Sequence, residues 1–158
     1  MDDSSFMELM KQHEGIVFKL VNLYATDQED RKDLVQEIMY QAWKGFSKFE
    51  GRSSFSTWLY RICLNTIFTQ KRKKHPVDYK ESLDLVSPAV ENHVTGSLEA
   101  KALYAAVRSL PEADRAIISL HLDGYDHGDI ADIIGLSDGN VRVKLHRIKK
   151  QLTNMLKD

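Results

Sequence analysis

The chain has 158 residues, of which 42% are hydrophobic and 28% are charged, and its formal net charge at pH 7 is −1. This composition is ordinary for a globular protein, and it excludes a chain that is disordered throughout. The single cysteine, Cys63, excludes an internal disulfide and any zinc site that needs several cysteines. No apolar run approaches the roughly 18 residues of a membrane span, and the N-terminus does not resemble a signal peptide. We therefore expect a cytoplasmic protein without membrane insertion.

Apolar residues recur at helical spacing almost throughout the chain, and strand-like alternation is rare, so the sequence predicts an all-α fold. The first amphipathic segment covers 6–25, as one long helix or as two helices with a break near Gly15. A second helix is expected over 27–46, and we expect Trp43 to lie in the core beside its buried face. That face consists of residues spaced four apart: Leu34, Ile38, Ala42 and Phe46.

A third helix is expected from Phe55 to about Lys74, because Ser54 can cap its N-terminus and Pro76 discourages its continuation. Cys63 lies within the apolar pattern of this helix. A thiol in that position is expected to be buried and structural.

Residues 76–97 combine weak periodicity with proline, glycine, serine and threonine, which predicts a flexible linker. The linker separates an N-terminal domain, 1–75, from a C-terminal domain, 98–158. Both domains are expected to be small and helical. In the second one, Pro111 fits the first turn of a helix that should end near Gly124.

The clearest local pattern lies near the C-terminus. Asp126 can cap a short helix, Gly135 can end it, and Ser137 or Asp138 can cap the helix that follows. Two helices joined by about three residues are typical of a helix-turn-helix, although a packed helical hairpin without a DNA-binding role has the same pattern. The expected buried stripe of the second helix is Val141, Leu145, Ile148 and Leu152.

The opposite face of this second helix combines cations with one apolar residue. Arginine can pair with guanine in the major groove, valine can contact the methyl group of thymine, and lysine can neutralise phosphate. Asn140 lies on the first turn, the part of a recognition helix that enters the groove most deeply. The other candidate residues of this face are Arg142, Val143, His146, Arg147 and Lys150.

Positive charge is concentrated in two stretches that contain no acid. Residues 51–77 and 139–157 each carry six Lys or Arg residues, whereas 78–99 carries five acids and one lysine. Two separate cationic surfaces suit two contacts with a polyanion such as nucleic acid. Solvated helix faces would give the same charge pattern.

In the first cationic stretch, aromatic residues alternate with the charges. A short loop around Gly51 is followed by Trp58 and Arg61, with Asn65 further along the same helix. Rings can stack on unstacked bases, an amide can bind a base edge, and cations can hold the backbone. Trp58 and Leu59 can instead be core residues, and we expect at least one of them to be buried.

Two blocks of the sequence resemble regions of bacterial RNA polymerase sigma factors of the sigma-70 family. The segments 33–37, 49–55 and 57–65 are similar to the second conserved region. The segment 110–112, followed by the helix-turn-helix and 141–147, is similar to the fourth. More narrowly, the chain resembles the extracytoplasmic-function (ECF) group, which keeps only these two regions. The resemblance implies an alternative sigma factor that binds core RNA polymerase and promoter DNA, with no catalytic chemistry and no cofactor.

The resemblance also implies roles for individual residues. The loop 49–55 would capture a flipped base of the non-template strand, Asn65 would read the minus-ten element, and the helix-turn-helix would read the minus-thirty-five element. By analogy with the group, an anti-sigma factor is a further partner. The residues implied to bind core polymerase are Asp33, Gln36 and Glu37, although acids near a helix N-terminus are also ordinary. Those implied to contact minus-ten DNA are Phe49, Ser53, Phe55, Arg61, Asn65, Lys71 and Arg72.

Two other classes of protein fit parts of the sequence. A helix-turn-helix regulator that acts without replacing the sigma subunit would explain 110–157 but leaves the aromatic tract 49–65 without a role. A metal-dependent enzyme would have to use the acids over 27–37, or His121 and His127. No nucleophile–base pair or phosphate-binding glycine loop accompanies them. The sequence therefore favours a sigma factor.

Overall fold

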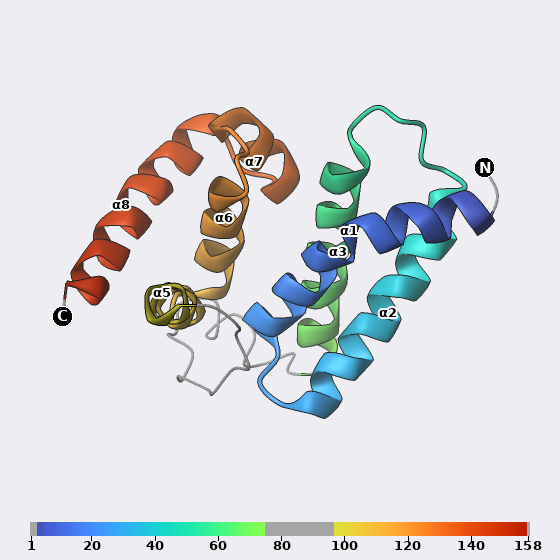
Figure 1. Ribbon diagram of the computed structural model, residues 1–158. Helices are drawn as coiled ribbons and strands as arrows, with labels where there is room; N and C mark the ends of the chain where they lie inside the picture. Colours follow the sequence, from blue (N-terminus) through green and yellow to red (C-terminus); the bar gives the residue numbers. More distant parts are fainter. Residues whose placement is uncertain (1–2, 75–96, 158) are drawn as a thin grey trace. The chain divides into compact units, whose positions relative to one another are not determined.

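The computed structural model describes residues 3–74 and 97–157, and within these ranges the chain forms helices and no strand (Figure 1). The all-α prediction is confirmed. The helices fall into two compact units, Met1–Pro76 and Val77–Asp158. Each unit has its own buried apolar side chains, so the two are described separately. The predicted linker 76–97 lies outside the described residues except at its last position.

The N-terminal unit consists of three helices that pack against one another: α1 (Asp3–Tyr24), α2 (Gln28–Phe46) and α3 (Phe55–Lys74). α1 is continuous through Gly15, which excludes the alternative of two helices with a break there. All three helices contribute to one core. Its fully buried side chains include Leu20, Ile38, Leu59, Tyr60 and Ile67.

α2 has the predicted buried stripe, and the structure adds an N-cap at Asp27. The carboxylate of Asp27 accepts a hydrogen bond of 2.7 Å from the backbone N–H of Asp30. Leu34, Ile38, Ala42 and Phe46 are all buried. The prediction for Trp43 is wrong, because this residue is 55% exposed. Its position is rotated about 100° around the helix from Ala42, which turns the indole away from the core.

α3 begins at its predicted cap and is tied to α1. The hydroxyl oxygen of Ser54 accepts a hydrogen bond of 3.2 Å from the backbone N–H of Thr57. The ammonium group of Lys19 donates to the hydroxyl of Tyr60 at 2.6 Å, which joins α1 to α3. Leu59 is completely buried, as expected for at least one residue of its pair with the tryptophan before it.

In its described part, the C-terminal unit has four helices: α5 (Leu98–Arg108), α6 (Glu112–Leu122), α7 (His127–Ile134) and α8 (Asp138–Leu156). α8 packs against the other three. Pro111 occupies the N-cap position of α6 rather than its first turn, because its ψ of 153° is still extended. Because α8 packs against α5, α6 and α7, the apolar faces of all four helices meet along α8.

α7 and α8 form the predicted helix-turn-helix. Asp126 caps α7 through a bond of 2.8 Å from the N–H of Asp129, and Ser137 caps α8 through a bond of 3.1 Å from the N–H of Asn140. Between them, Gly135 has a φ of 85°, a left-handed conformation that glycine adopts without a steric penalty. The predicted buried stripe of α8 is confirmed at Val141, Leu145, Ile148 and Leu152.

Candidate nucleic-acid interface

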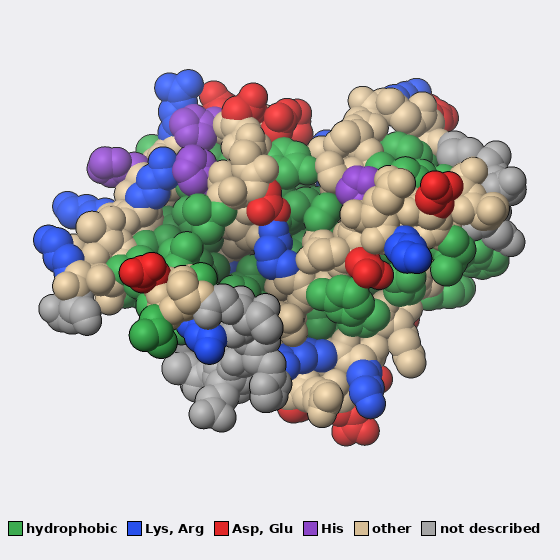
Figure 2. Space-filling view, viewed as in Figure 1, with side chains coloured by type: hydrophobic (Ala, Val, Ile, Leu, Met, Phe, Trp, Pro, Cys, Tyr) green, Lys and Arg blue, Asp and Glu red, His purple; other side chains and the backbone are tan. Residues whose placement is uncertain are grey.

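α8 presents one broad face outward. Lys and Arg side chains follow this helix in the space-filling view (Figure 2). Val143 is 70% exposed among these cations, so it offers an apolar contact within a charged surface. All the residues predicted for this face are exposed, and they occupy one arc opposite the buried stripe: Asn140, Arg142, Val143, His146, Arg147 and Lys150.

Arg147 is anchored to the neighbouring helix α6. Its Nη2 donates to both carboxylate oxygens of Asp114, at 3.2 and 3.1 Å. The side chain of Asp114 is only 6% exposed, whereas that of Arg147 is 53% exposed. Arg142, in contrast, has an exposed contact of 3.7 Å with Asp138, which water and salt weaken. Arg147 is therefore held in place while half of its surface still faces solvent.

Histidines accompany the cations of this surface. His121, at the end of α6, has its pKa lowered from the usual 6.5 by partial burial, and further by the positive charges of Lys149 and His127. Groups from α6, α7 and α8 thus meet at this corner. The lowered pKa favours the neutral form of His121 and limits the positive charge there.

The loop between α2 and α3 carries the residues predicted to capture a base. Gly51 has a φ of 74°, which makes the tight bend in this loop. Arg52 and Glu50 form an exposed ion pair of 2.9 Å beside it. The ring of Phe49 lies 5.2 Å from that of Trp58 on α3, and this contact anchors the start of the loop.

Phe55 was predicted to contact DNA, but its ring is buried. It lies 5.4 Å from the ring of Trp58 and 5.0 Å from that of His13, and the residue is only 8% exposed. A ring that is covered in this way does not offer a face to a base. Phe55 therefore packs under the loop, where its ring contacts that of Phe49. Phe49 and Ser53 are half-buried and keep part of their surface exposed.

The predicted minus-ten residues of α3 do not all lie at one site. Asn65 is exposed and borders a polar cavity of about 170 Å³ between α2 and α3. Arg61 is half-buried and Arg72 is exposed. Lys71 does not lie with Asn65, because it lines a second, larger cavity that the acids of α2 also border.

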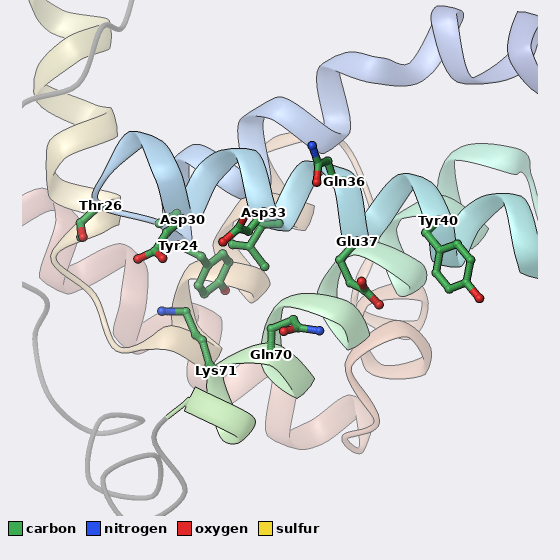
Figure 3. Close-up of a pocket in the computed structure, with 11 residues that line it drawn as sticks. Tyr24, Thr26, Asp30, Asp33, Gln36, Glu37, Tyr40, Gln70 and Lys71 are labelled. Carbon is green, nitrogen blue, oxygen red and sulfur yellow. The ribbon is translucent and has the colours of Figure 1, made fainter.

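This larger cavity has a volume of about 630 Å³ and is shown in Figure 3. The ammonium group of Lys71 points toward Asp30, and the side chains of Glu37 and Gln70 turn toward one another across the gap between α2 and α3 (Figure 3). The cavity therefore combines acids with a cation and amides. All three residues predicted to bind polymerase border it: Asp33, Gln36 and Glu37.

Cys63 is completely buried, which confirms the predicted structural thiol. Burial raises the pKa of this thiol to about 12, against a small opposing effect of the positive charge of Lys19. The group is therefore protonated and inert in the folded protein at neutral pH.

The described residues offer neither a metal site nor a membrane span. No group of three or more His, Cys, Asp or Glu side chains among them is placed to hold a metal ion. His121 and His127, considered as ligands from the sequence, belong to no such group. Within 3–74 and 97–157, no helix is both long and apolar enough to cross a bilayer.

Sequence reasoning missed two features of this interface. Asp114 lies in the first turn of α6, where acids are ordinary, and nothing in the local sequence indicates a partner 33 residues later. The cavities between α2 and α3 also have no sequence signal, because each is lined from two helices. Both features depend on tertiary packing.

These elements define a helical DNA-binding protein with two units, one of which ends in a helix-turn-helix. The sequence matches the family descriptions "Sigma-70 region 2" over residues 9–76 and "Sigma-70, region 4" over residues 100–152. The first match covers most of α1 and all of α2 and α3, and the second covers all of α6 and α7 and most of α5 and α8.

Similar proteins carry the same family assignment. The chain is 30% identical to the ECF RNA polymerase sigma-E factor of Escherichia coli (strain K12), over 97% of this chain and 87% of that one. It is 29% identical to the ECF sigma factor SigM of Mycobacterium tuberculosis (strain H37Rv), over 98% and 79%. The fold is shared with the sigma factor RpoE, solved in complex with the anti-sigma factor NepR from Bartonella quintana. That match has a TM-score of 0.78 at 24% identity over 97% of each chain. The chain belongs to the ECF sigma factors of RNA polymerase.

Proposed function

We propose that this sigma factor recognises its promoter through two DNA-binding surfaces on separate domains, 1–75 and 98–158. As a member of its family, it is an alternative sigma factor that directs core RNA polymerase to promoters, and the catalysis belongs to the polymerase. The observation that carries the proposal is the exposed arc of α8, where Val143 stands among cations opposite a completely buried stripe.

The arc of α8 reads the minus-thirty-five element as duplex DNA. Asn140 lies on the first turn, beside the cap at Ser137, and enters the major groove first. Val143 contacts a thymine methyl group, and Arg147, anchored by Asp114, pairs with a base edge. The residues that supply phosphate contacts or further base contacts are Arg142, His146 and Lys150.

The loop between α2 and α3 captures an extruded base of the minus-ten element. Phe49 and Ser53 form the capture site, with Phe55 beneath them as support. Asn65 reads a neighbouring base edge, and Arg61 holds the backbone. Capture recovers the few kcal/mol lost when a base is unstacked, so that strand opening is coupled to binding. Arg72 supplies a further phosphate contact.

The acidic face of α2 binds core polymerase. Asp33 and Gln36 are exposed, and Glu37 is half-buried at the border of the larger cavity. Acids suit a cationic partner surface and not DNA. Lys71 borders the same cavity as these acids and its ammonium group points toward Asp30, and we retain it as a phosphate contact of the minus-ten strand.

Regulation and location follow from the same assignment. Each unit is small and offers few DNA contacts, so the free protein should bind promoters weakly. An anti-sigma factor, as in the complex solved for RpoE, would keep both units from polymerase. Because core polymerase works on the bacterial chromosome, we place the protein in the cytoplasm.

The test is run-off transcription with purified core polymerase on a promoter library. We expect start sites that occur only when this protein is present. At promoters that match the wild-type preference, those starts should become weaker when Asn65→Ala is introduced, while the affinity for polymerase is retained. If Gln36→Ala and Glu37→Ala together leave polymerase affinity unchanged, the assignment of α2 is wrong. Dimerisation and binding to palindromic DNA without polymerase would support a conventional regulator instead.

A further inference from the structure

The small cavity beside Asn65 has further lining residues that the promoter contacts above do not use. It has a volume of about 170 Å³ and lies between α2 and α3. We propose that it receives one base of the opened non-template strand, with Gln41 as a specificity-determining residue and Glu37 as the residue that positions Gln41. This inference rests on the promoter function proposed above.

The lining has the chemistry of a base-binding site. Every residue that lines it carries a polar group beside its aliphatic carbons: Glu37, Gln41, Asn65, Thr66, Thr69, Gln70 and Lys73. Amides present a donor and an acceptor side by side, which is the pattern that pairs with a base edge. Lys73 is exposed at the border of the cavity and can neutralise the adjoining phosphate.

The amide of Gln41 is held in one orientation. Its Nε2 donates to Oε1 of Glu37, one helical turn earlier on α2, at 2.9 Å. Because a carboxylate only accepts hydrogen bonds, the NH₂ group must face Glu37, and the carbonyl oxygen of Gln41 faces elsewhere. We infer that this oxygen is the acceptor that Gln41 offers to the cavity it borders. An exocyclic amino group of a base suits such an acceptor. Thymine offers only its N3–H, between two carbonyl oxygens that repel another acceptor, so it should be disfavoured at the position that enters the cavity.

Glu37 and Gln70 border both this cavity and the larger acidic cavity. A change at either residue therefore affects two surfaces at once. Gln41 borders only the smaller one, which makes it the cleaner probe. Substitutions at Glu37 are informative once polymerase is already bound, because any loss of polymerase affinity is then compensated by saturation.

The experiment uses holoenzyme assembled from core polymerase and the full-length chain. Promoter templates carry a pre-opened bubble in which each non-template base is varied in turn, and relative binding is measured by competition. The test variant is Gln41→Leu, which keeps the approximate size of the side chain but removes its hydrogen bonds. The control is Gln12→Leu, at an exposed position of α1. With Gln41→Leu, we expect discrimination against thymine to fall roughly five- to hundredfold at one position. Other positions and polymerase affinity should stay unchanged, and Gln12→Leu should change nothing.

Glu37 is tested in the same holoenzyme at saturating polymerase. Glu37→Ala should weaken discrimination at the position affected by Gln41→Leu. Glu37→Gln should restore it, because its carbonyl oxygen can still accept from Gln41. A role that is merely structural would not give this rescue at one base position.

The inference is overturned if Gln41→Leu leaves the base profile unchanged at every position. It is also overturned if this variant lowers polymerase affinity while the profile stays intact, because the cavity would then be a protein contact. Either outcome in an active holoenzyme refutes only the role of Gln41. If wild-type holoenzyme shows no start sites of its own, the promoter function itself fails and this inference falls with it.

Discussion

At the scale of single residues, Arg147 shows how one side chain can serve the fold and the DNA-binding surface together. Its guanidinium group holds the buried carboxylate of Asp114 while about half of the side chain remains exposed. Such anchoring lowers the entropy that the side chain loses on binding. The sequence indicates an arginine on the outer arc of α8, but it gives no sign of the partner on α6.

The pair should respond asymmetrically to substitution. Arg147→Ala leaves a buried carboxylate without its partner, which costs on the order of 1–3 kcal/mol. Asp114→Ala leaves a half-exposed arginine that water can solvate, so the loss should be smaller. Hydrogen exchange of the α6 and α8 amides in the full chain measures both. Arg142→Ala, with its weak exposed contact, is the control and should cost no more than about 0.5 kcal/mol. A larger loss for Asp114→Ala than for Arg147→Ala would contradict this account.

Cys63 gives a second prediction at this scale. Because the thiol is buried and protonated, a thiol reagent should react with the native protein only through unfolding. Adding urea should raise the labelling rate in parallel with the unfolded fraction. The folded pKa is about 12 against an ordinary 9.0, so the unfolded chain loses its proton first. Stability should therefore fall as pH rises through that interval. Fast labelling of the native protein at neutral pH would show that the Cys63 thiol is not buried.

At the scale of helices, the local sequence was enough to predict the features that local interactions determine. The caps at Ser54, Asp126 and Ser137 and the buried stripes of α2 and α8 were predicted, because side-chain spacing and capping chemistry determine them. The structure differed from the sequence-based prediction where packing between helices determines whether a side chain is buried. Phe55 is buried because its ring packs against His13 of α1 and Phe46 of α2. The cavity beside Asn65 could not be predicted for the same reason.

The turn of the helix-turn-helix depends on one glycine. Gly135→Ala forces a side chain into a left-handed conformation and should destabilise the C-terminal unit by roughly 1 kcal/mol. Gly139→Ala is the matched control. It lies in the first turn of α8 with no neighbour within 4 Å of an added Cβ, so it should be neutral or stabilising. Urea denaturation followed by circular dichroism compares the two. Equal stability of both variants would contradict the role of the turn.

Two residues on the arc of α8 should separate phosphate attraction from base reading. Lys150→Ala should weaken promoter binding about equally for all sequences and reduce the slope of log affinity against log salt by about 1. Val143→Ala should leave that slope unchanged but relax the preference at one base pair. Holoenzyme binding to promoter variants at several salt concentrations distinguishes them. The assignment of this face would be wrong if both variants acted only on the salt slope.

At the scale of the whole molecule, the proposed function requires two small units to act on the same promoter. Each unit has its own core and its own exposed surface: the loop and α3 in one, α8 in the other. Neither surface is large, so specificity arises when polymerase holds both units on one DNA. The sequence predicted this division from charge and helix patterns. It could not give the geometry of the surfaces, which depends on contacts between helices.

The most direct measurement uses holoenzyme on a library in which both promoter elements are randomised, with start sites mapped for three proteins. Wild type should select two sequence elements upstream of each start. Asn65→Ala should relax the preference only in the downstream element, and Val143→Ala only in the upstream one. If both variants alter the same element, or if neither alters any element, the two units do not read the promoter as proposed.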